Sequence, residues 1–223
     1  MRIWQRIRNN MKNFLILTNE KKDPGLRISK KIQDYIEKQG GISQRMCDFT
    51  RHVQKDMNCI TKDTECVIVL GGDGTMLHAA RLIVELVNKK LPGYYRTPAS
   101  QIQVLTPMQR GVVGATNLNM ALQEALNPKG EGLRRSGFVY RPNDKVMQIK
   151  NNYDKEVFNG DIGIIESVDL QDRTLLVNFE GRSIEYDATE LDELVHAYAT
   201  TIHKAQGSEY PIVVMPVLMN HFV

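Results

Sequence analysis

The chain has 223 residues, of which 42% are hydrophobic and 25% are charged, and its formal net charge at pH 7 is +3. This length and apolar content suffice for one large domain or two small ones, each with a core of its own. No apolar stretch is long enough to span a lipid bilayer, so we expect neither a membrane protein nor a membrane partner.

The charge is divided unevenly along the chain. Residues 1–81 hold 15 lysines and arginines against 9 acidic residues, a net +6, whereas residues 82–223 hold 14 against 17, a net −3. A basic segment favours an anionic ligand such as a nucleotide. The acidic segment is a poor DNA binder by itself, because non-specific DNA binding comes mainly from neutralising phosphates.

The cysteines and the amino terminus favour a reducing cytoplasm. Cys47, Cys59 and Cys66 are odd in number and form no CxxC pair, so they indicate neither a disulfide framework nor a zinc site. We therefore expect no bound structural metal. The basic amino terminus is followed by an apolar run too short for a signal peptide. Either Met1 or Met11 could be the true start.

The first segments of the chain alternate between strand and helix patterns. A continuous apolar run at residues 14–18 predicts a strand buried on both faces. Helical spacing of apolar residues then predicts a helix over 28–36, with Pro24 near its first turn and Gly40-Gly41 at its end.

The next segments complete the prediction of a parallel α/β sheet. Residues 42–62 are weakly patterned and suggest an edge strand and a loop, and residues 66–70 predict a second buried strand. A helix follows from Met76, and its apolar pattern continues to Val87. Two buried strands separated by a helix indicate a parallel sheet, whose open edges would allow self-association.

The turn Gly71-Gly72-Asp73-Gly74-Thr75 lies between the predicted second strand and the helix. Ligands of α/β sheets bind at such carboxyl ends of strands, where glycines admit phosphate oxygens and the helix amino terminus favours an anion. Asp73 could take a proton from a ribose hydroxyl or help to hold magnesium. The alternative is an ordinary glycine turn in which Asp73 or Thr75 caps the helix.

This first segment resembles the amino-terminal domain of a bacterial NAD kinase, over about residues 11–81. The resemblance is carried by the strand at 13–19, the helix after it and the Gly-Gly-Asp-Gly-Thr turn. It implies that Asp73 activates the 2′-hydroxyl of NAD, the substrate, for attack on the γ-phosphate of ATP. The second glycine-rich loop and the β-rich domain that complete the NAD pocket in that family are not found in this sequence.

The second part of the chain has a different pattern. Residues 102–107 predict a strand ending in a turn, and residues 118–126 predict a helix closed by Asn127-Pro128. From about Gly137, alternating segments joined by turn-rich connectors predict a small antiparallel β-barrel. Its predicted strands are 145–150, 161–169, 174–179 and 183–186.

A polar loop near the carboxyl end carries the second set of candidate site residues. It follows residues 194–198, which read as a strand or a helix, and precedes a predicted buried strand at 211–215. Thr201, His203 and Lys204 offer a hydroxyl, an imidazole and an ammonium suited to a nucleic-acid backbone. An ordinary solvated surface is the alternative reading of such a His-Lys pair.

The loop continues with a second polar string. Gln206-Gly207-Ser208-Glu209 could place a backbone amide near a γ-phosphate and a carboxylate near a ribose. The whole Thr-x-His-Lys-x-Gln-Gly-x-Glu pattern before an apolar strand is far more specific than either half of it alone.

With the Gln103-Val104-Leu105-Thr106-Pro107-Met108 segment and the predicted barrel, this pattern resembles the carboxyl-terminal part of a RecD-like superfamily-one DNA helicase. The resemblance covers about residues 82–223. It implies that Thr201, His203 and Lys204 lie near single-stranded DNA. It also implies ATP and Mg²⁺ as cofactors, with a set of residues near the nucleotide: Gln206, Gly207, Glu209 and, as a weaker candidate, Arg110.

The expected architecture is therefore α/β and composite. An incomplete parallel α/β piece, residues 1–81, is joined to a partial RecA-like domain, residues 82–136 and 191–223. The small antiparallel β-barrel, residues 137–190, is inserted into that domain. The predicted helix from Met76 crosses the boundary without losing its period.

Each half lacks partners that its resemblance requires. No GxxxxGK[ST] motif occurs in the sequence, so no P-loop holds ATP phosphates, and the chain stops before the arginine-bearing motif of the helicases. Three hypotheses remain: a helicase-derived module that binds single-stranded DNA weakly, an NAD kinase, and a non-functional composite from gene rearrangement or mis-joined sequence reads. In the first and third, we expect no helicase activity from the chain alone.

Overall fold

The computed structural model describes residues 12–18, 23–46, 60–61, 63–64, 66–70 and 73–216. The chain forms two compact units. The first consists of Met1–Arg96 with Met215–Val223, and the second of Thr97–Val214. None of the helices among the described residues is both long enough and apolar enough to cross a membrane.

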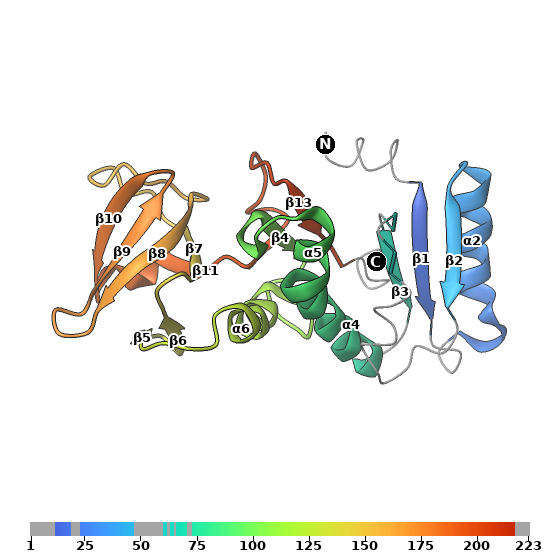
Figure 1. The fold of residues 1–223 in the computed structure, drawn as a ribbon, viewed down its shortest axis with the longest axis horizontal. Coiled ribbons are helices and arrows are strands. Elements are labelled where there is room, and N and C mark those ends of the chain that lie inside the picture. The colour runs from blue at the N-terminus through green and yellow to red at the C-terminus, as the bar shows by residue number, and fades with distance from the viewer. Residues whose placement is uncertain are drawn as a thin grey trace. The chain divides into compact units, whose positions relative to one another are not determined.

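The first unit contains a three-stranded parallel sheet with the order β2-β1-β3 (Figure 1). Its strands are β1 (Asn13–Thr18), β2 (Ile42–Met46) and β3 (Cys66–Leu70). The parallel sheet is confirmed, and the weakly patterned segment after residue 41 supplies its edge strand β2. Leu15, Ile16 and Leu17 are almost completely buried, as a strand covered on both faces requires.

Helix α2 (Arg27–Lys38) packs on this sheet and follows a short 3-10 turn, η1 (Pro24–Leu26). Asp23 caps it: its two carboxylate oxygens accept the backbone N–H groups of Ile28 (2.8 Å) and Ser29 (2.9 Å). Burial alone would raise the pKa of Asp23, but these hydrogen bonds lower it below its ordinary value. Among the described residues, Ile16, Ile36 and Leu70 are the buried members of the core beneath the helix.

The predicted helix across the boundary at residue 82 is confirmed. Helix α4 (Asp73–Glu85) runs without interruption into a π-helical turn, η2 (Leu86–Lys90), and then into α5 (Leu91–Tyr95). The predicted apolar stripe is largely the buried face: Ala79, Ala80, Ile83, Leu86 and Val87 are all buried.

The second unit contains a parallel sheet with the order β12-β4-β13. Its strands are β4 (Ile102–Thr106), β12 (Ala199–Thr201) and β13 (Ile212–Val214), and η3 (Ala99–Gln101) precedes β4. All five residues of β4 are buried, as its central position requires. The strand predicted at 211–215 is present as β13, but the expectation that it is buried is wrong. β13 lies at the edge of the sheet, and Val213 is 47% exposed.

Helix α6 (Ala115–Leu126) packs against β12. It begins three residues before the predicted start and ends at the predicted residue. Gly114 precedes it in a tight approach, because a Cβ atom there would lie 2.4 Å from the backbone carbonyl carbon and oxygen of Arg110. Leu118 and Leu122 are fully buried on the inner face of the helix.

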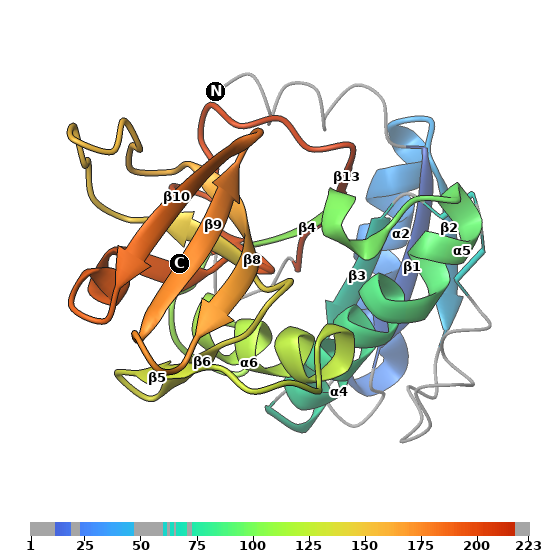
Figure 2. The same cartoon turned by 60° about the vertical axis from the view of Figure 1, so that its left-hand side comes forward.

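An antiparallel sheet with the order β10-β9-β8-β7-β11 forms the rest of this unit (Figure 2). A separate hairpin, β5 (Leu133–Arg135) and β6 (Phe138–Tyr140), precedes it, and the 3-10 turn η4 (Glu190–Glu193) precedes β11. The strands of the sheet are β7 (Lys145–Gln148), β8 (Ile162–Asp169), β9 (Thr174–Phe179), β10 (Arg182–Asp187) and β11 (Leu194–His196).

The prediction of a closed barrel over residues 137–190 is corrected by this order. β10 and β11 are the two edges of the sheet and do not pair with each other, so the sheet is open. The prediction missed that residues 194–196, outside the expected barrel, add β11 beside β7. Residues 194–198 were predicted to be either a strand or a helix. The structure shows extended chain that passes from β11 into β12.

The predicted turns between the antiparallel strands are confirmed. The carboxylate of Asp169 accepts the backbone N–H groups of Gln171 (2.7 Å) and Asp172 (2.9 Å) after β8. Glu180 and Gly181 both have positive φ, the geometry of the tight two-residue hairpin between β9 and β10.

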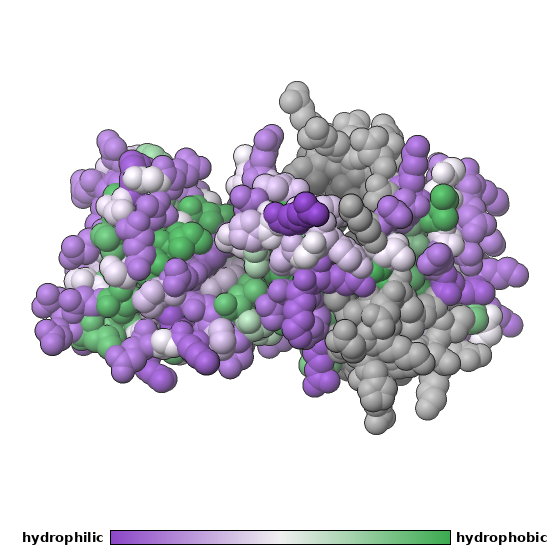
Figure 3. Space-filling view, viewed as in Figure 1, coloured by the Kyte–Doolittle hydropathy of each residue, from purple (hydrophilic) through white to green (hydrophobic). Residues whose placement is uncertain are grey.

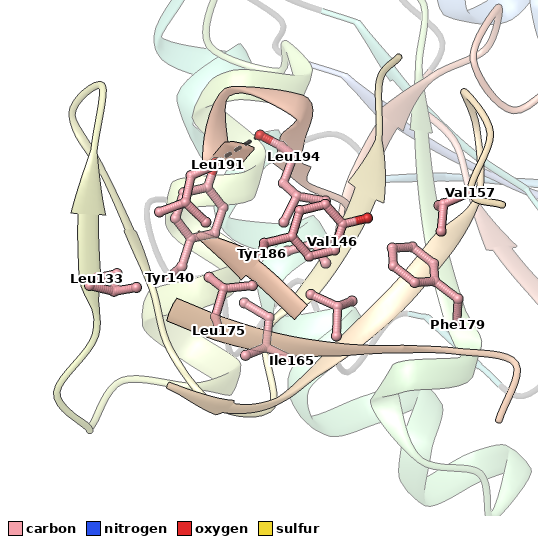
Figure 4. Packing of buried hydrophobic residues seen from close by; sticks show 11 residues of the cluster. Leu133, Tyr140, Val146, Val157, Ile165, Leu175, Phe179, Tyr186, Leu191 and Leu194 are labelled. Atoms are coloured by element: carbon pink, nitrogen blue, oxygen red, sulfur yellow. Dashed lines mark hydrogen bonds between the residues drawn. The ribbon is translucent and has the colours of Figure 1, made fainter. Parts of the chain in front are cut away.

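A core of buried hydrophobic residues lies against this sheet (Figure 4). Two tyrosines pack in this core, and the hydroxyl of each donates a hydrogen bond. Tyr140 donates to the carbonyl of Leu194 (2.8 Å), and Tyr186 donates to Oε1 of Gln148 (3.0 Å). The other buried members are Leu133, Val146, Val157, Ile165, Leu175, Val177, Phe179, Leu191 and Leu194.

Candidate nucleic-acid interface

The Thr200–Tyr210 loop begins at the carboxyl end of β12, beside the carboxyl end of β4. Thr201 pairs with Thr106 in register, and the backbone N–H of Ile202 donates to the carbonyl of Thr106 (3.0 Å). The loop therefore emerges where parallel α/β sheets hold their ligands.

The loop turns back on itself immediately after Thr201. The backbone N–H of Ala205 donates to the carbonyl of Thr201 (3.1 Å), and Ala205 is buried, which anchors the turn. His203 and Lys204 project from it and are exposed, whereas Thr201 is half-buried. Among the residues that the structure describes, Lys204 makes no ion pair, so its ammonium group is available to an anion.

Asn119 of α6 holds the strand that carries the loop. Its Nδ2 donates to the carbonyl of Ala199 (2.7 Å), and its Oδ1 accepts the N–H of the same residue (2.8 Å). Asn119 is 7% exposed, so both backbone groups depend on this one side chain rather than on water. The position of the loop is thus set by a residue 80 positions away in the sequence.

Gln103 holds the same segment from the side of β4. Its fully buried Nε2 donates to the carbonyl of Ala197 (3.0 Å), and its Oε1 accepts a hydrogen bond from the Nζ of Lys145 (2.8 Å). Lys145 also donates to the carbonyl of Ser100 (3.1 Å), and it has no carboxylate partner among the described residues. Its burial lowers the pKa of Lys145 from 10.5 to about 8.

Asp144 organises a buried polar network next to these contacts. Its carboxylate accepts hydrogen bonds from Gln123 (2.6 Å), Asn127 (2.7 Å) and the hydroxyl of Tyr198 (2.9 Å), and its Oδ2 lies 3.2 Å from Nε2 of His196. Burial acts to raise the pKa of Asp144, but the hydrogen bonds outweigh it and lower the pKa. The network ties α6 to the segment between β11 and β12.

A groove opens beside the loop, between α6 and the strands β7, β11 and β12. Thr201 and Lys204 belong to its lining, and Gln109 donates to Thr116 across one wall (3.0 Å). Its remaining lining residues are Ala115, Asn119, Phe138, Met147, Val195, His196, Ala199 and Thr200. The structure thus brings two of the three predicted DNA-contacting residues to one depression in the surface.

The residues predicted to face the nucleotide lie on two exposed loops of this unit. Arg110 follows β4, and Gln206, Gly207 and Glu209 follow the turn after β12. Gly207 has a φ of +91°, which favours glycine at this position. Within the described chain, no hydrogen bond or ion pair joins Arg110 to Gln206 or Glu209.

The kinase-like residues lie in the other unit. Asp73 is the first residue of α4, and Gly74 and Thr75 are in its first turn. Gly71 and Gly72 fall outside the described residues, so the predicted phosphate-binding turn stays a prediction. In the described part of the chain, no group of three or more His, Cys, Asp or Glu side chains is placed to hold a metal ion.

Sequence reasoning missed the residues that support the loop. Gln103 is a polar residue in an otherwise apolar strand, and a buried polar side chain there must find partners. That signal could have marked Gln103. Asn119, Asp144 and Lys145 carried no comparable signal, because each has a partner 42 to 80 positions away: Ala199, His196 and Gln103, respectively.

Comparison with known proteins gives two separate likenesses. A family model described as the SH3 domain of ATP-dependent RecD-like DNA helicases matches residues 118–179, and the UvrD-like helicase C-terminal domain matches residues 196–223. The ATP-dependent RecD2 DNA helicase of Deinococcus radiodurans is 40% identical over 129 residues, which are 55% of this chain and 18% of that protein.

The second likeness is to NAD kinases. The NAD kinase of Agathobacter rectalis is 34% identical over 79 residues, which are 34% of this chain and 28% of that protein. The chain therefore spans less than a third of either curated relative.

A solved structure of a Pif1 helicase from Bacteroides, in complex with ADP-AlF3 and ssDNA, overlaps 96% of this chain and 66% of its own, at 15% identity and a TM-score of 0.43. That overlap is too loose to assign equivalent residues. The sequence likenesses are specific, and the chain resembles a RecD-like DNA helicase in its longer part and an NAD kinase in its first part.

Proposed function

We propose that the longer part of the chain is a helicase-derived module that binds single-stranded DNA through Thr201, His203 and Lys204. The observation that carries this proposal is the groove beside the loop, which has both Thr201 and Lys204 in its lining. The 40% identity to a DNA helicase over 129 residues supports it. In this reading, residues 82–136 and 191–223 form a partial RecA-like domain, and residues 137–190 form the inserted small β-domain.

The chemistry of the loop suits a phosphodiester backbone. Lys204 offers an exposed ammonium, His203 an exposed imidazole, and Thr201 a hydroxyl at the end of a strand. Contacts of this kind position a strand without reading its bases. Because the segment from residue 82 onward has a net charge of −3, we expect weak, salt-sensitive binding.

We propose that the chain supplies residues for only one side of an ATP site. Gln206, Gly207, Glu209 and Arg110 would face the nucleotide, and Mg²⁺ would accompany it, but the sequence holds no P-loop for the phosphates. Catalysis of phosphoryl transfer depends on positioning the nucleotide between opposed groups. We therefore propose that the chain alone neither hydrolyses ATP nor unwinds DNA.

The test is equilibrium binding of the full chain to a fluorescent oligo(dT) strand at low salt. The His203→Ala, Lys204→Ala double variant should bind at least about tenfold more weakly, since each charged contact contributes about 1 kcal/mol or more. Lys150→Ala, an exposed lysine outside the groove, is the matched control and should bind like the unchanged chain. Equal binding by the double variant, or none by the unchanged chain, would refute the proposal.

NAD kinase activity is the second candidate, with ATP as phosphoryl donor and NAD as substrate. The observation in its favour is that Asp73 begins α4 directly after a strand of a parallel sheet, within a segment 34% identical to an NAD kinase. There Asp73 would accept the proton of the 2′-hydroxyl. ATP-dependent NADP formation that disappears in Asp73→Asn would establish this activity, and its absence from the unchanged chain would remove it.

We further propose that the two halves are fused fragments of separate proteins. Residues 1–81 would come from the kinase and residues 82–223 from the helicase. One long read of source DNA across the codons for Asp73 through Gln103 tests this directly. A continuous reading frame would support a fusion gene, whereas separate kinase and helicase loci would contradict it.

A further inference from the structure

The groove beside the Thr201–Lys204 loop has two chemically different parts. Its accessible rim is polar, with the exposed Lys204 and Gln109 and the half-buried Thr201 and Thr116. Its lining also includes the half-buried ring of Phe138 and the side chains of Met147 and Val195. A site for phosphate alone needs the polar groups but gains nothing from an aromatic ring.

The aromatic group in the lining is held in place by its surroundings. Phe138 meets the ring of His196 edge-on, with ring centroids 5.9 Å apart, and His196 in turn stacks on Tyr140 at 4.9 Å. His196 is also fixed by Asp144, at 3.2 Å. A ring that is fixed before binding loses little conformational freedom when a planar ligand packs against it.

We propose that this groove is a base-binding subsite that takes one unstacked base of single-stranded DNA. The base packs against Phe138 while its phosphates lie at the rim, near Lys204 and Thr201. This inference rests on the proposed DNA-binding function and adds the ligand class of the same site. It predicts that the protein distinguishes strands by their bases as well as by their charge.

The test compares strands that carry the same phosphates but different bases. Full-length protein is titrated with oligo(dT) and with an abasic strand of equal length, in which every base is replaced by hydrogen. Oligo(dT) should bind at least about fivefold more tightly, the lower end of what one base–aromatic contact contributes. Equal affinities would overturn the subsite and leave the phosphate contacts standing; no binding of either strand would overturn both.

Two variants of one residue assign the effect to the groove. Phe138→Leu keeps an apolar side chain for the core but removes the ring, so the advantage of oligo(dT) over the abasic strand should shrink to less than about twofold. Phe138→Ala also removes the ring, so the same advantage of oligo(dT) over the abasic strand should shrink by a similar factor. An unchanged advantage in both variants contradicts the proposal.

Tyr153→Ala is the matched control for loss of an aromatic side chain. Tyr153 is 75% exposed and packs edge-to-face with Phe158 at 5.9 Å, on the loop after β7 and outside the groove. The surface over the antiparallel sheet, at the left of Figure 3, mixes polar and hydrophobic residues, so an exposed ring alone is not distinctive there. Tyr153→Ala should keep the full difference between oligo(dT) and the abasic strand.

Discussion

Both units of this protein contain a three-stranded parallel sheet with candidate site residues after one of its strands. In the second unit, Asn119 and Gln103 hold the strand and the segment before the Thr201–Lys204 loop through buried hydrogen bonds. In the first unit, Asp73 begins a helix after β3, and the glycines before it lie outside the described residues. A motif becomes a site when residues far away in the sequence fix its geometry, and the described contacts identify such residues for the second unit.

The second unit has, among the described residues, a cluster of eleven buried hydrophobic members beside the antiparallel sheet. Burial of apolar area is the main favourable contribution to folding. We therefore expect substitutions in this cluster to lower the free energy of unfolding more than substitutions at exposed positions do.

The largest expected effect comes from emptying the large core. Ile165→Ala should lower the free energy of unfolding of the second unit by about 2–5 kcal/mol, because Ile165 is fully buried and its removal leaves a cavity. Urea unfolding followed by circular dichroism measures the change. Leu170→Ala, at a 45% exposed turn position, is the control and should change it by less than about 0.5 kcal/mol. Equal effects at the two positions would contradict the assigned core.

The Asn119 contact with Ala199 should have the next largest effect. Asn119→Ala leaves a buried N–H and a buried carbonyl without partners, so we expect a loss of about 2–4 kcal/mol of unfolding free energy together with weaker DNA binding. Asn117→Ala removes a single hydrogen bond to the carbonyl of Val112 and should cost about 1 kcal/mol. If Asn119→Ala unfolds no more easily than Asn117→Ala, Asn119 does not position the strand.

The pH dependence of stability should show a smaller effect, caused by Lys145 of the second unit. The pKa of Lys145 is about 8 in the fold and 10.5 without burial, so between these values the unfolded chain binds more protons and stability rises with pH. We expect a rise of up to about 2 kcal/mol between pH 8 and 10. Urea midpoints across this range should show the rise in the unchanged chain and lose it in Lys145→Met. A flat profile in the unchanged chain would contradict a Lys145 whose pKa is lowered by burial.

The upper limit of that window is set by tyrosines. Burial raises the pKa of Tyr140 to about 12, and it also raises the pKa values of Tyr186 and Tyr198. Near pH 10 these groups begin to ionise in the unfolded chain but not in the folded one, so stability falls again at higher pH. Tyr186→Phe should weaken this fall.

Local patterns were enough to predict most of the elements. The apolar runs at β1 and β4 and the periodic stripe of α4 are largely buried, and β3 forms at the predicted residues. The patterns failed where an element depends on a distant partner. β11 adds to the antiparallel sheet by pairing with β7, and β13 is exposed because it lies at an edge; neither fact is encoded in its own residues.

The candidate site divides in the same way. Thr201 and Lys204 were recognised from a sequence pattern, and the structure brings both to the groove. Phe138 and Asn119 were not predicted, because they meet the segment from β11 to β12 only in the folded chain. The polar partners of Lys145 were hidden for the same reason, since they come from β4 and η3.

The central claim is that Lys204 binds a DNA phosphate beside the groove, and the salt dependence of binding tests it most directly. Removing one lysine–phosphate interaction with single-stranded DNA should make the slope of log K against log salt concentration shallower by about 0.7. We predict this decrease for Lys204→Gln and no decrease for Lys150→Gln. An unchanged slope for Lys204→Gln, with oligo(dT) still bound, would contradict the account.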